Sequence, residues 1–346
     1  MYYNNLEPDI AAGLKELKRR IDAHKLPASA LDKTLKVATW NIREFGNPAR
    51  PRTKRSLHYI AEILLQFDLI GVVELRDNVS EMAEVLRMLG PTWDIIYSDY
   101  IEDAGGNRER VGFVFDARAC SFTGLAGNAN EPRKKKGVEY LPESSWWRKP
   151  FMASFRSGNF DFVALTTHIR WGETEKNRTA ELGMLANYVV ARTVKETAID
   201  SDLVVMGDFN IPSLDSPLYK AVVKRGLTMP ASLAGITGSN LGKNKRYDQI
   251  LHNPVYTKSI TNKGGCLDFI GDGWGALYPE AKSEFDQDFT YQLSDHLPLW
   301  IMIDTDTDAE QLDQCSRPTA QRRSGTPRVN PPAQATLWSS SDFTSA

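Results

Sequence analysis

The stretch from Asp202 to Pro212 constrains the fold more than any other part of the chain. It reads DLVVMGDFNIP, and its apolar residues 203–206 form an unbroken run that ends at Gly207. A short run of this kind, bounded by a turn residue, is typical of a strand buried on both faces. Asp208 and Asn210 follow at once, and they point to the same side if the chain is still extended there. They are either turn formers that close the strand, or a carboxylate and an amide placed for a metal ion or a phosphate.

The pattern of an apolar run followed by a polar side chain recurs along the chain. Strand-like apolar runs at residues 35–40, 69–73 and 160–167 also end in a polar side chain, and further polar residues occupy or precede the runs at 246–251 and 297–301. The polar side chains concerned are Asn41, Glu74, His168, Asp248, Asp295 and His296. Any one of them could face water at a strand end, but together they predict a sheet edge that gathers carboxylates and two histidines. Such a set suits metal-assisted hydrolysis of a phosphate ester, with histidine for proton transfer.

Patterning along the chain predicts three parts. Residues 1–34 form an N-terminal helical extension, residues 35–304 form the main domain, and residues 305–346, rich in Ser, Thr, Pro, Gln and Arg, form a disordered C-terminal tail. In the main domain we expect helices that end near residue 66 and cover residues 79–89, 173–195 and 217–224, a hairpin of residues 150–155 and 160–168, and an exposed loop at 128–142.

Composition narrows the class of protein. The chain has 346 residues, of which 41% are apolar and 25% charged, as in a soluble globular protein. No apolar run is long enough for a membrane segment, and the N-terminus lacks the apolar core of a signal peptide. The three cysteines show neither a disulfide framework nor zinc spacing, which predicts a reducing, cytoplasmic compartment. Because the net charge is −2, contacts with phosphates depend on local basic clusters such as residues 50–55 and 133–136.

Three motifs carry a resemblance to a known family. They are TWNIREFG at residues 39–46, MGDFN at 206–210 and SDHLP at 294–298. In these motifs the chain resembles the endonuclease/exonuclease/phosphatase superfamily, and it is similar in detail to the deoxyribonuclease I branch. The resemblance implies an α/β fold, a four-layer α/β/β/α sandwich of two packed mixed sheets with outer helices.

The resemblance also implies a metal site. Glu74 resembles the main magnesium ligand of the family, with Asn41, Asp208 and Asp295 beside the ion, and Mn²⁺ is possible in place of Mg²⁺. Asp208 further matches the acid that orients the attacking water, and Asn210 matches the amide beside the phosphate.

His168 and His296 resemble the family's paired histidines. Glu109 matches the acid that orients the first histidine, and Asp248 matches the acid that orients the second. Carboxylate–imidazole pairs of this kind fix the tautomer and raise the histidine pKa.

Two arginines match positions that bind substrate. Arg148 resembles the arginine that grips the phosphate, and Arg76 falls where deoxyribonuclease I sends an arginine into the minor groove. There are departures: Val73 stands where the family usually has Gln, and Arg43 stands where abasic-site endonucleases have an acid. The second departure counts against that branch.

The function that the resemblance implies is a magnesium-dependent phosphodiester hydrolase, a nuclease that cleaves DNA by in-line attack of an activated water. DNA is then the expected partner, and no protein partner is evident. A phosphatase or phosphodiesterase for a lipid headgroup or a small phosphate ester remains the alternative, and a catalytically inactive binding module is the third possibility.

Overall fold

Two β-sheets form the centre of the computed structural model, which describes residues 6–100, 108–131, 133–142, 145–171, 174–193, 200–283, 286–308 and 312. The six-stranded sheet has the order β12-β13-β1-β2-β4-β3 and the five-stranded sheet the order β11-β10-β9-β8-β5. The strands of the first sheet are β1 (Thr34–Phe45), β2 (Leu69–Leu75), β3 (Trp93–Tyr97), β4 (Arg110–Asp116), β12 (Ile260–Cys266) and β13 (Leu299–Asp304). Those of the second are β5 (Ser121–Asn128), β8 (Phe151–Ser157), β9 (Phe160–His168), β10 (Leu203–Asp208) and β11 (Asp248–His252).

Both sheets are mixed. The pairs β1–β2 and β9–β10 are parallel, and the other neighbouring strands run antiparallel. The hairpin that the sequence predicts at residues 150–168 is confirmed as β8 and β9.

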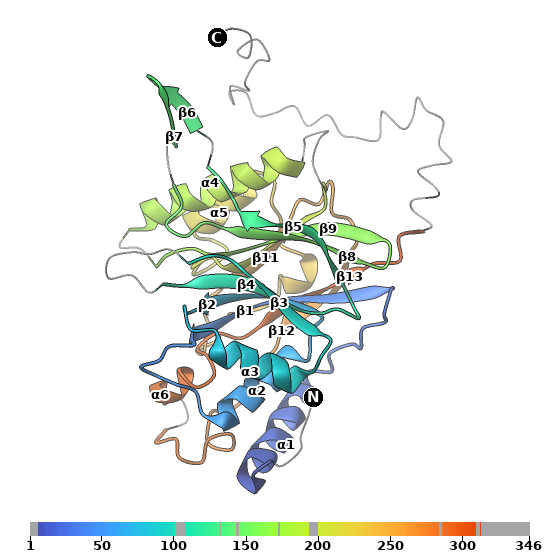
Figure 1. Cartoon of the computed structure of the whole chain (residues 1–346), viewed down its shortest axis with the longest axis vertical. Helices are drawn as coiled ribbons and strands as arrows, with labels where there is room; N and C mark the ends of the chain where they lie inside the picture. Colours follow the sequence, from blue (N-terminus) through green and yellow to red (C-terminus); the bar gives the residue numbers. More distant parts are fainter. Residues whose placement is uncertain are drawn as a thin grey trace. The chain divides into compact units, whose positions relative to one another are not determined.

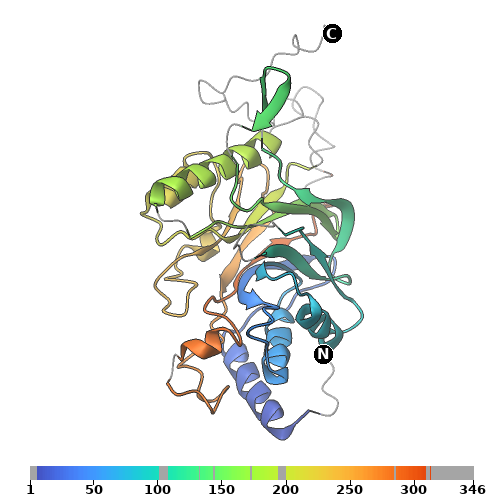
Figure 2. The same cartoon turned by 60° about the vertical axis from the view of Figure 1, so that its left-hand side comes forward.

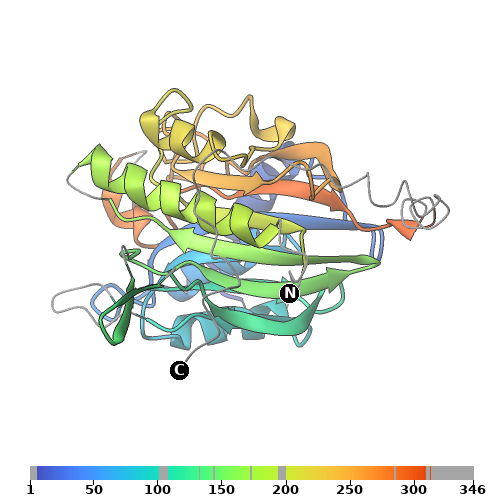
Figure 3. The same cartoon turned by 90° about the horizontal axis from the view of Figure 1, so that it is seen from above.

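Helices cover the outer face of each sheet. The six-stranded sheet packs against α1 (Pro8–Ala23), α2 (Lys54–Leu64) and α3 (Ser80–Leu89), and the five-stranded sheet packs against α4 (Glu175–Thr193) and α5 (Pro217–Val223) (Figures 1 and 3). The short helices are α6 (Gln287–Thr290) and a 3₁₀ turn at Ala231–Leu233. The predicted four-layer α/β/β/α sandwich is therefore confirmed. Among the described helices, none has the length and apolar character needed to cross a membrane.

Local sequence explains where these helices begin and which face they bury. α2 starts after Thr53, whose side chain accepts a hydrogen bond from the Ser56 N–H, and α5 starts after Ser216, which caps it in the same way with Pro217 in the first turn. α1 buries Ile10, Leu14, Leu17 and Ile21, spaced as one face of a helix, and lies beside α2 (Figure 2).

Strand β10 joins two of the three core layers. Val204 and Met206 belong to the cluster between the two sheets, whereas Leu203 and Val205 belong to the cluster under α4 and α5. This alternation explains why the apolar run is unbroken, because both faces of the strand are buried. All six residues of β10 are buried.

The structure differs from the sequence-based expectation in the segment 128–142, which was predicted as an exposed loop. It contains the two-stranded hairpin of β6 (Arg133–Lys136) and β7 (Glu139–Pro142). Gly137 makes the turn with φ of +66°, a conformation in which glycine is favoured. β6 consists of Arg and Lys alone, and β7 is the four-residue segment EYLP that ends in Pro142, so neither strand gave a clear signal in the sequence.

The strands β5 and β12 and the helix α6 were also not predicted. β5 is an edge strand whose residues are mostly exposed, and β12 contains Gly264 and Gly265. Short edge strands of this composition lack the apolar run that identifies a buried strand.

The predicted boundaries of the main domain, at residues 35 and 304, stay predictions. Thr305 is fully buried, and its N–H donates to the carbonyl of Lys33. Residues 309–311 and 313–346 of the predicted tail lie outside the described residues.

Gly207, which the sequence suggested as the turn residue that ends the apolar run, lies within β10 and has no room there for a side chain. Its φ is +136°, and a Cβ at this position would lie 1.9 Å from the carbonyl oxygen of Thr167 on the neighbouring strand. We therefore predict that Gly207→Ala lowers the free energy of unfolding by about 2–4 kcal/mol, which corresponds to a fall in Tm of roughly 5–15 °C.

The matched control is Gly235→Ala, since a Cβ at Gly235 meets no atom within 4 Å. Thermal unfolding followed by circular dichroism compares the two variants with the wild type. Equal Tm values for both variants would show that the close approach of β9 and β10 at Gly207 is misplaced.

Candidate active site

An open cleft of about 770 Å³ lies at the strand ends that the sequence singled out. Its lining is almost entirely polar or aromatic. The carboxylates are Glu44, Glu74, Glu109, Asp208 and Asp295, the basic side chains are Arg43, Arg148, Arg170, His168 and His296, and the remainder are Trp147, Trp171, Asn177, Asn210 and Tyr247.

Asp208 lies at the centre of the cleft because of strand register. It ends β10, where it pairs with His168 of the parallel strand β9 and with Asp248 of the antiparallel strand β11. Its Oδ2 lies 3.7 Å from Nε2 of His168 and 3.7 Å from Nε2 of His296. The same oxygen accepts a hydrogen bond of 3.1 Å from the Asn41 amide. Both sheets thus contribute to one buried polar cluster.

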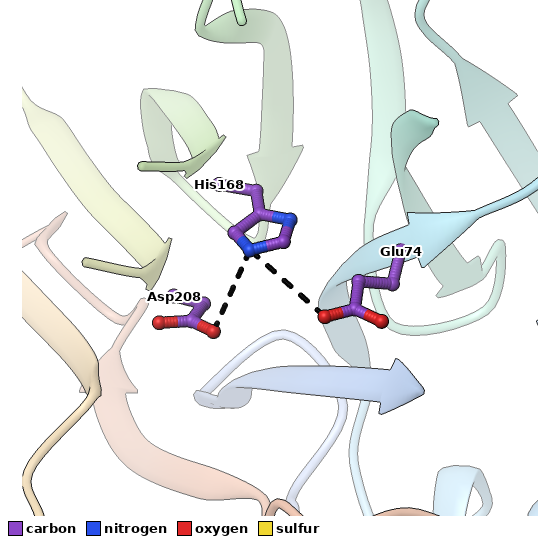
Figure 4. A group of neighbouring side chains, drawn as sticks. All are labelled: Glu74, His168 and Asp208. Carbon is purple, nitrogen blue, oxygen red and sulfur yellow. Dashed lines mark ion pairs between the residues drawn. The ribbon is translucent and has the colours of Figure 1, made fainter. Parts of the chain in front are cut away.

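Glu74 reaches this cluster through an irregularity at the ends of β1 and β2. The register between these strands shifts between Asn41 and Phe45, and Glu44 and Glu74 adopt φ of +47° and +62°. The Glu74 carboxylate accepts hydrogen bonds from the Asn41 amide (2.8 Å) and from the Glu44 N–H (3.0 Å). Its Oε1 lies 3.9 Å from Nε2 of His168, and Figure 4 shows Glu74, His168 and Asp208 converging. Positive φ at such residues is strained, and strain of this kind concentrates at functional sites.

The donor set fits a hard divalent cation. Single donor atoms of Glu74, His168 and Asp208 lie within 4.8 Å of one another. The Oδ1 atom of Asn41 is buried and has no hydrogen-bond partner, although the amide nitrogen of the same side chain bonds to Glu74 and Asp208. A buried acceptor without a partner is costly unless something else binds there. Carboxylate and amide oxygens are the ligands that hard cations take.

His168 is held by Glu109. Its Nδ1 lies 2.9 Å from Oε2 of Glu109, and Nε of Arg148 forms an ion pair with the same oxygen at 3.0 Å. Burial alone would lower the pKa of His168, but the hydrogen bond that its ring donates to the Glu109 carboxylate and the charge of that carboxylate outweigh burial, so the pKa is raised. One carboxylate oxygen therefore positions both the histidine and the arginine.

His296 is held in the same way by Asp248. Its Nδ1 lies 2.7 Å from Oδ2 of Asp248, which also accepts a hydrogen bond of 2.6 Å from the Ser239 hydroxyl. Burial opposes the charged imidazolium, but the charges of Asp248 and Asp208 raise the pKa of His296 well above its usual value. Burial also raises the pKa of Asp248. Because Nδ1 is occupied in both histidines, each presents Nε2 to Asp208.

Asn210 lies in the cleft because the backbone turns after β10 and is no longer extended at this residue. Its φ is +50°, and its N–H donates to Oδ1 of Asp208 at 2.8 Å. The side-chain amide donates to the carbonyl of Ile169 at 2.6 Å. Asp208 and Asn210 are therefore turn formers that also line the cleft, and their role toward a metal ion or a phosphate stays a prediction.

Two predicted site residues are not brought into the cluster. Asp295 lines the cleft, but its Oδ2 lies 3.6 Å from Nη1 of Arg43, and it belongs to neither of the two carboxylate–histidine groups of the described residues. The other group joins Asp208, Asp248 and His296. Arg76 does not line the cleft. Their assigned roles stay predictions.

Sequence reasoning missed the aromatic side chains of the cleft. Trp147 precedes Arg148 and Trp171 follows His168 by three residues, but tryptophans next to a motif are usually buried and their exposure cannot be read from a pattern. Tyr247, next to Asp248, was missed for the same reason. Arg43 was noted only as a departure, yet it lines the cleft and contacts Asp295.

Comparisons with known proteins show the family to which the chain belongs. The family model described as "Endonuclease/Exonuclease/phosphatase family" matches residues 38–296. A deoxyribonuclease from Thioalkalivibrio sp. (strain K90mix) is 26% identical over 299 residues, which cover 82% of this chain and 74% of the relative.

Two solved structures share the fold. The catalytic domain of human Nocturnin, solved with a bound sulfate anion, has a TM-score of 0.52 at 16% identity and covers 80% of this chain and 96% of its own. A family protein from Bacteroides thetaiotaomicron has a TM-score of 0.51 at 16% identity and covers 78% of this chain and 97% of its own. With the matched region extending from β1 to His296, the chain belongs to the endonuclease/exonuclease/phosphatase family of hydrolases.

Proposed function

We propose that the chain is a divalent-metal-dependent phosphodiester hydrolase that cleaves DNA. The observation that carries the proposal is the position of Asp208 Oδ2 between the Nε2 atoms of two histidines, each held at Nδ1 by its own acid. Two histidines aimed at one point suit a reaction that removes a proton from water and delivers one to a leaving oxygen.

Glu74, Asp208 and Asn41 Oδ1 are the groups that would hold the metal, which we propose is Mg²⁺, with Mn²⁺ as a substitute. A bound divalent ion supplies positive charge that neutralises the phosphate oxygens as negative charge develops on them. Glu74 is fixed for this role by two hydrogen bonds, which leave its carboxylate little freedom.

Other side chains of the cleft bind the phosphate, orient the attacking water and transfer protons. Arg148 and the Asn210 amide bind phosphate oxygens, and Asp208 orients the attacking water. The Nε2 of one histidine takes the proton of that water, and the Nε2 of the other gives a proton to the oxygen that leaves. Glu109 and Asp248 stabilise the imidazolium in each case, which agrees with the raised pKa of both histidines.

DNA as the substrate is supported by the similarity to a protein named deoxyribonuclease. It is also supported by cationic side chains on the cleft wall, namely Arg43, Arg148 and Arg170, since a polyanion needs several such contacts. The alternative is a small phosphate ester or a lipid headgroup.

A substrate panel tests the proposal. Supercoiled plasmid DNA, single-stranded DNA, RNA, bis(p-nitrophenyl) phosphate and phosphoinositide vesicles are each incubated with Mg²⁺, with Mn²⁺ and with a chelator. We expect metal-dependent cleavage of DNA. Turnover of the phosphoinositides, or of bis(p-nitrophenyl) phosphate alone, with no cleavage of DNA would favour the alternative function.

Glu74→Gln tests the metal site. The change keeps the shape of the side chain but removes its negative charge, so the affinity for the metal falls because too few anionic ligands remain. We expect an activity loss of about 10²-fold or more at low Mg²⁺ and partial recovery at high Mg²⁺, with an unchanged Tm. The control is Glu84→Gln on the exposed face of α3, where Glu84 contacts Arg87. An unaltered magnesium dependence in Glu74→Gln would contradict the assignment.

The two histidine–acid pairs test the mechanism. We expect His168→Ala and His296→Ala each to lower kcat by about 10²–10⁴-fold, the usual contribution of general acid–base catalysis. Asp248→Asn lowers kcat by less, because the acid only orients and stabilises the imidazole. Glu109→Gln also raises KM, since the same carboxylate oxygen positions Arg148. The double variant His168→Ala/Glu109→Gln is far from additive in kcat.

Steady-state kinetics with DNA and with bis(p-nitrophenyl) phosphate measure these effects, and His24→Ala serves as the control because His24 lies outside the cleft. Near-normal turnover of both substrates by His168→Ala would contradict the paired-histidine mechanism and leave His168 as a satisfied strand-end histidine.

A further inference from the structure

Two tryptophans on the wall of the cleft are exposed. Trp147 has 51% and Trp171 has 66% of its surface accessible, and both line the cleft that contains Asp208. Trp147 lies in the segment between β7 and β8, and Trp171 follows β9. Neither contributes to catalysis in the mechanism above, and leaving large aromatic rings in water forgoes the stabilisation that burial would provide.

Arginines hold both rings in place. The guanidinium of Arg170 lies 4.9 Å from the ring centroid of Trp147, and that of Arg178 on α4 lies 5.1 Å from that of Trp171. These contacts orient the tryptophans by cation–π attraction while leaving much of each ring accessible. Arg178 is itself fixed by a hydrogen bond of 2.9 Å to the carbonyl of Asn210.

Aromatic contacts connect Trp171 to the catalytic cluster. Trp171 packs edge-to-face on Tyr247 with ring centroids 5.5 Å apart, and Tyr247 lies 5.9 Å from the ring of His296. A row of aromatic rings thus runs from the exposed rim to the histidine that we place at the reacting phosphate. A ligand group stacked on Trp171 is therefore close to that phosphate.

The chemistry of this rim selects a flat aromatic group that belongs to a phosphodiester. A nucleobase has such a face, whereas a lipid headgroup or a sugar phosphate does not. In a duplex both faces of a base are covered by its neighbours, so only an unpaired base can stack on a protein ring. Arginine next to each ring adds attraction for the adjoining phosphates.

We propose that the rim formed by Trp147 and Trp171 stacks unpaired nucleobases beside the scissile phosphate, so that the preferred substrate is single-stranded or frayed DNA. This rests on the proposed function for the identity of the reacting group. The rim selects the substrate and takes no part in proton transfer.

A binding experiment with matched ligands tests the rim apart from hydrolysis. Fluorescence anisotropy, with the metal chelated to stop cleavage, measures the affinity for a labelled single-stranded thymidine oligonucleotide. The comparison ligands are a strand of equal length that has abasic tetrahydrofuran residues throughout, and a duplex. The abasic strand keeps the phosphate charge but lacks the bases.

We expect the wild type to bind the thymidine strand about 10- to 100-fold more tightly than the abasic strand, the usual effect of base–aromatic stacking. Trp171→Ala reduces this preference several-fold, the double variant Trp147→Ala/Trp171→Ala reduces it to about twofold or less, and Trp171→Phe retains most of it, because phenylalanine keeps an aromatic face. Tyr140→Ala is the control, since Tyr140 is an exposed aromatic side chain (55%) that does not line the cleft.

Three results would overturn the inference. They are equal affinity of the wild type for the two strands, an equal loss for both strands in Trp171→Ala, and tighter binding of the duplex than of the single strand. The proposed function fails separately, if the substrate panel shows no metal-dependent hydrolysis of DNA while the preference for bases persists.

Kinetics give a second readout. In Trp171→Ala we expect kcat/KM for the single-stranded thymidine oligonucleotide to fall about 10- to 100-fold through KM, whereas kcat/KM for the abasic strand changes by about twofold or less, because that strand has no base to stack. A similar fall in kcat for both substrates would assign Trp171 to supporting Tyr247 and His296 and would overturn the stacking role.

Discussion

The register of β9, β10 and β11 is the constraint on which the rest of the site depends. It places His168, Asp208 and Asp248 side by side at the ends of three neighbouring strands. A shift of one residue in either pairing would turn these side chains to the opposite face of the sheet. The apolar alternation of β10 fixes the register, because Val204 and Met206 fill the core between the sheets while Leu203 and Val205 pack under the helices. The same strand register therefore determines both the packing of the core and the geometry of the site.

Burial then determines the electrostatics of the cluster. Asp208, His168 and His296 are each less than a tenth exposed, so their interactions are weakly screened by water. Each histidine has a carboxylate at Nδ1, and this raises both histidine pKa values despite the cost of burying charge. Glu109 and Asp248 are thus as much part of the site as the side chains that face the substrate.

Sequence patterns predicted the hairpin and most strand ends because these follow from local apolar periodicity, whereas the four-layer sandwich was implied by the motif resemblance. The motif resemblance placed Glu74, His168, Asp208 and His296, which the structure brings together. Patterns did not reveal the irregularity that turns Glu74 inward or the turn at Asn210, since both depend on positive φ in non-glycine residues. They also missed the β6–β7 hairpin and the exposed tryptophans, because two four-residue strands, one of them entirely basic, and the solvent exposure of a single residue leave no periodic signal. Asp295, expected at the metal, lies beside Arg43.

The central claim is that Glu74, Asp208 and Asn41 form one metal-binding centre within reach of both histidines. Anomalous X-ray diffraction from crystals soaked in Mn²⁺ tests it most directly, because the scattering of manganese locates the ion without reference to activity. We expect an anomalous peak bounded by the Glu74 and Asp208 carboxylates and the Asn41 side-chain oxygen. A peak elsewhere on the protein, with none in the cleft, would contradict it.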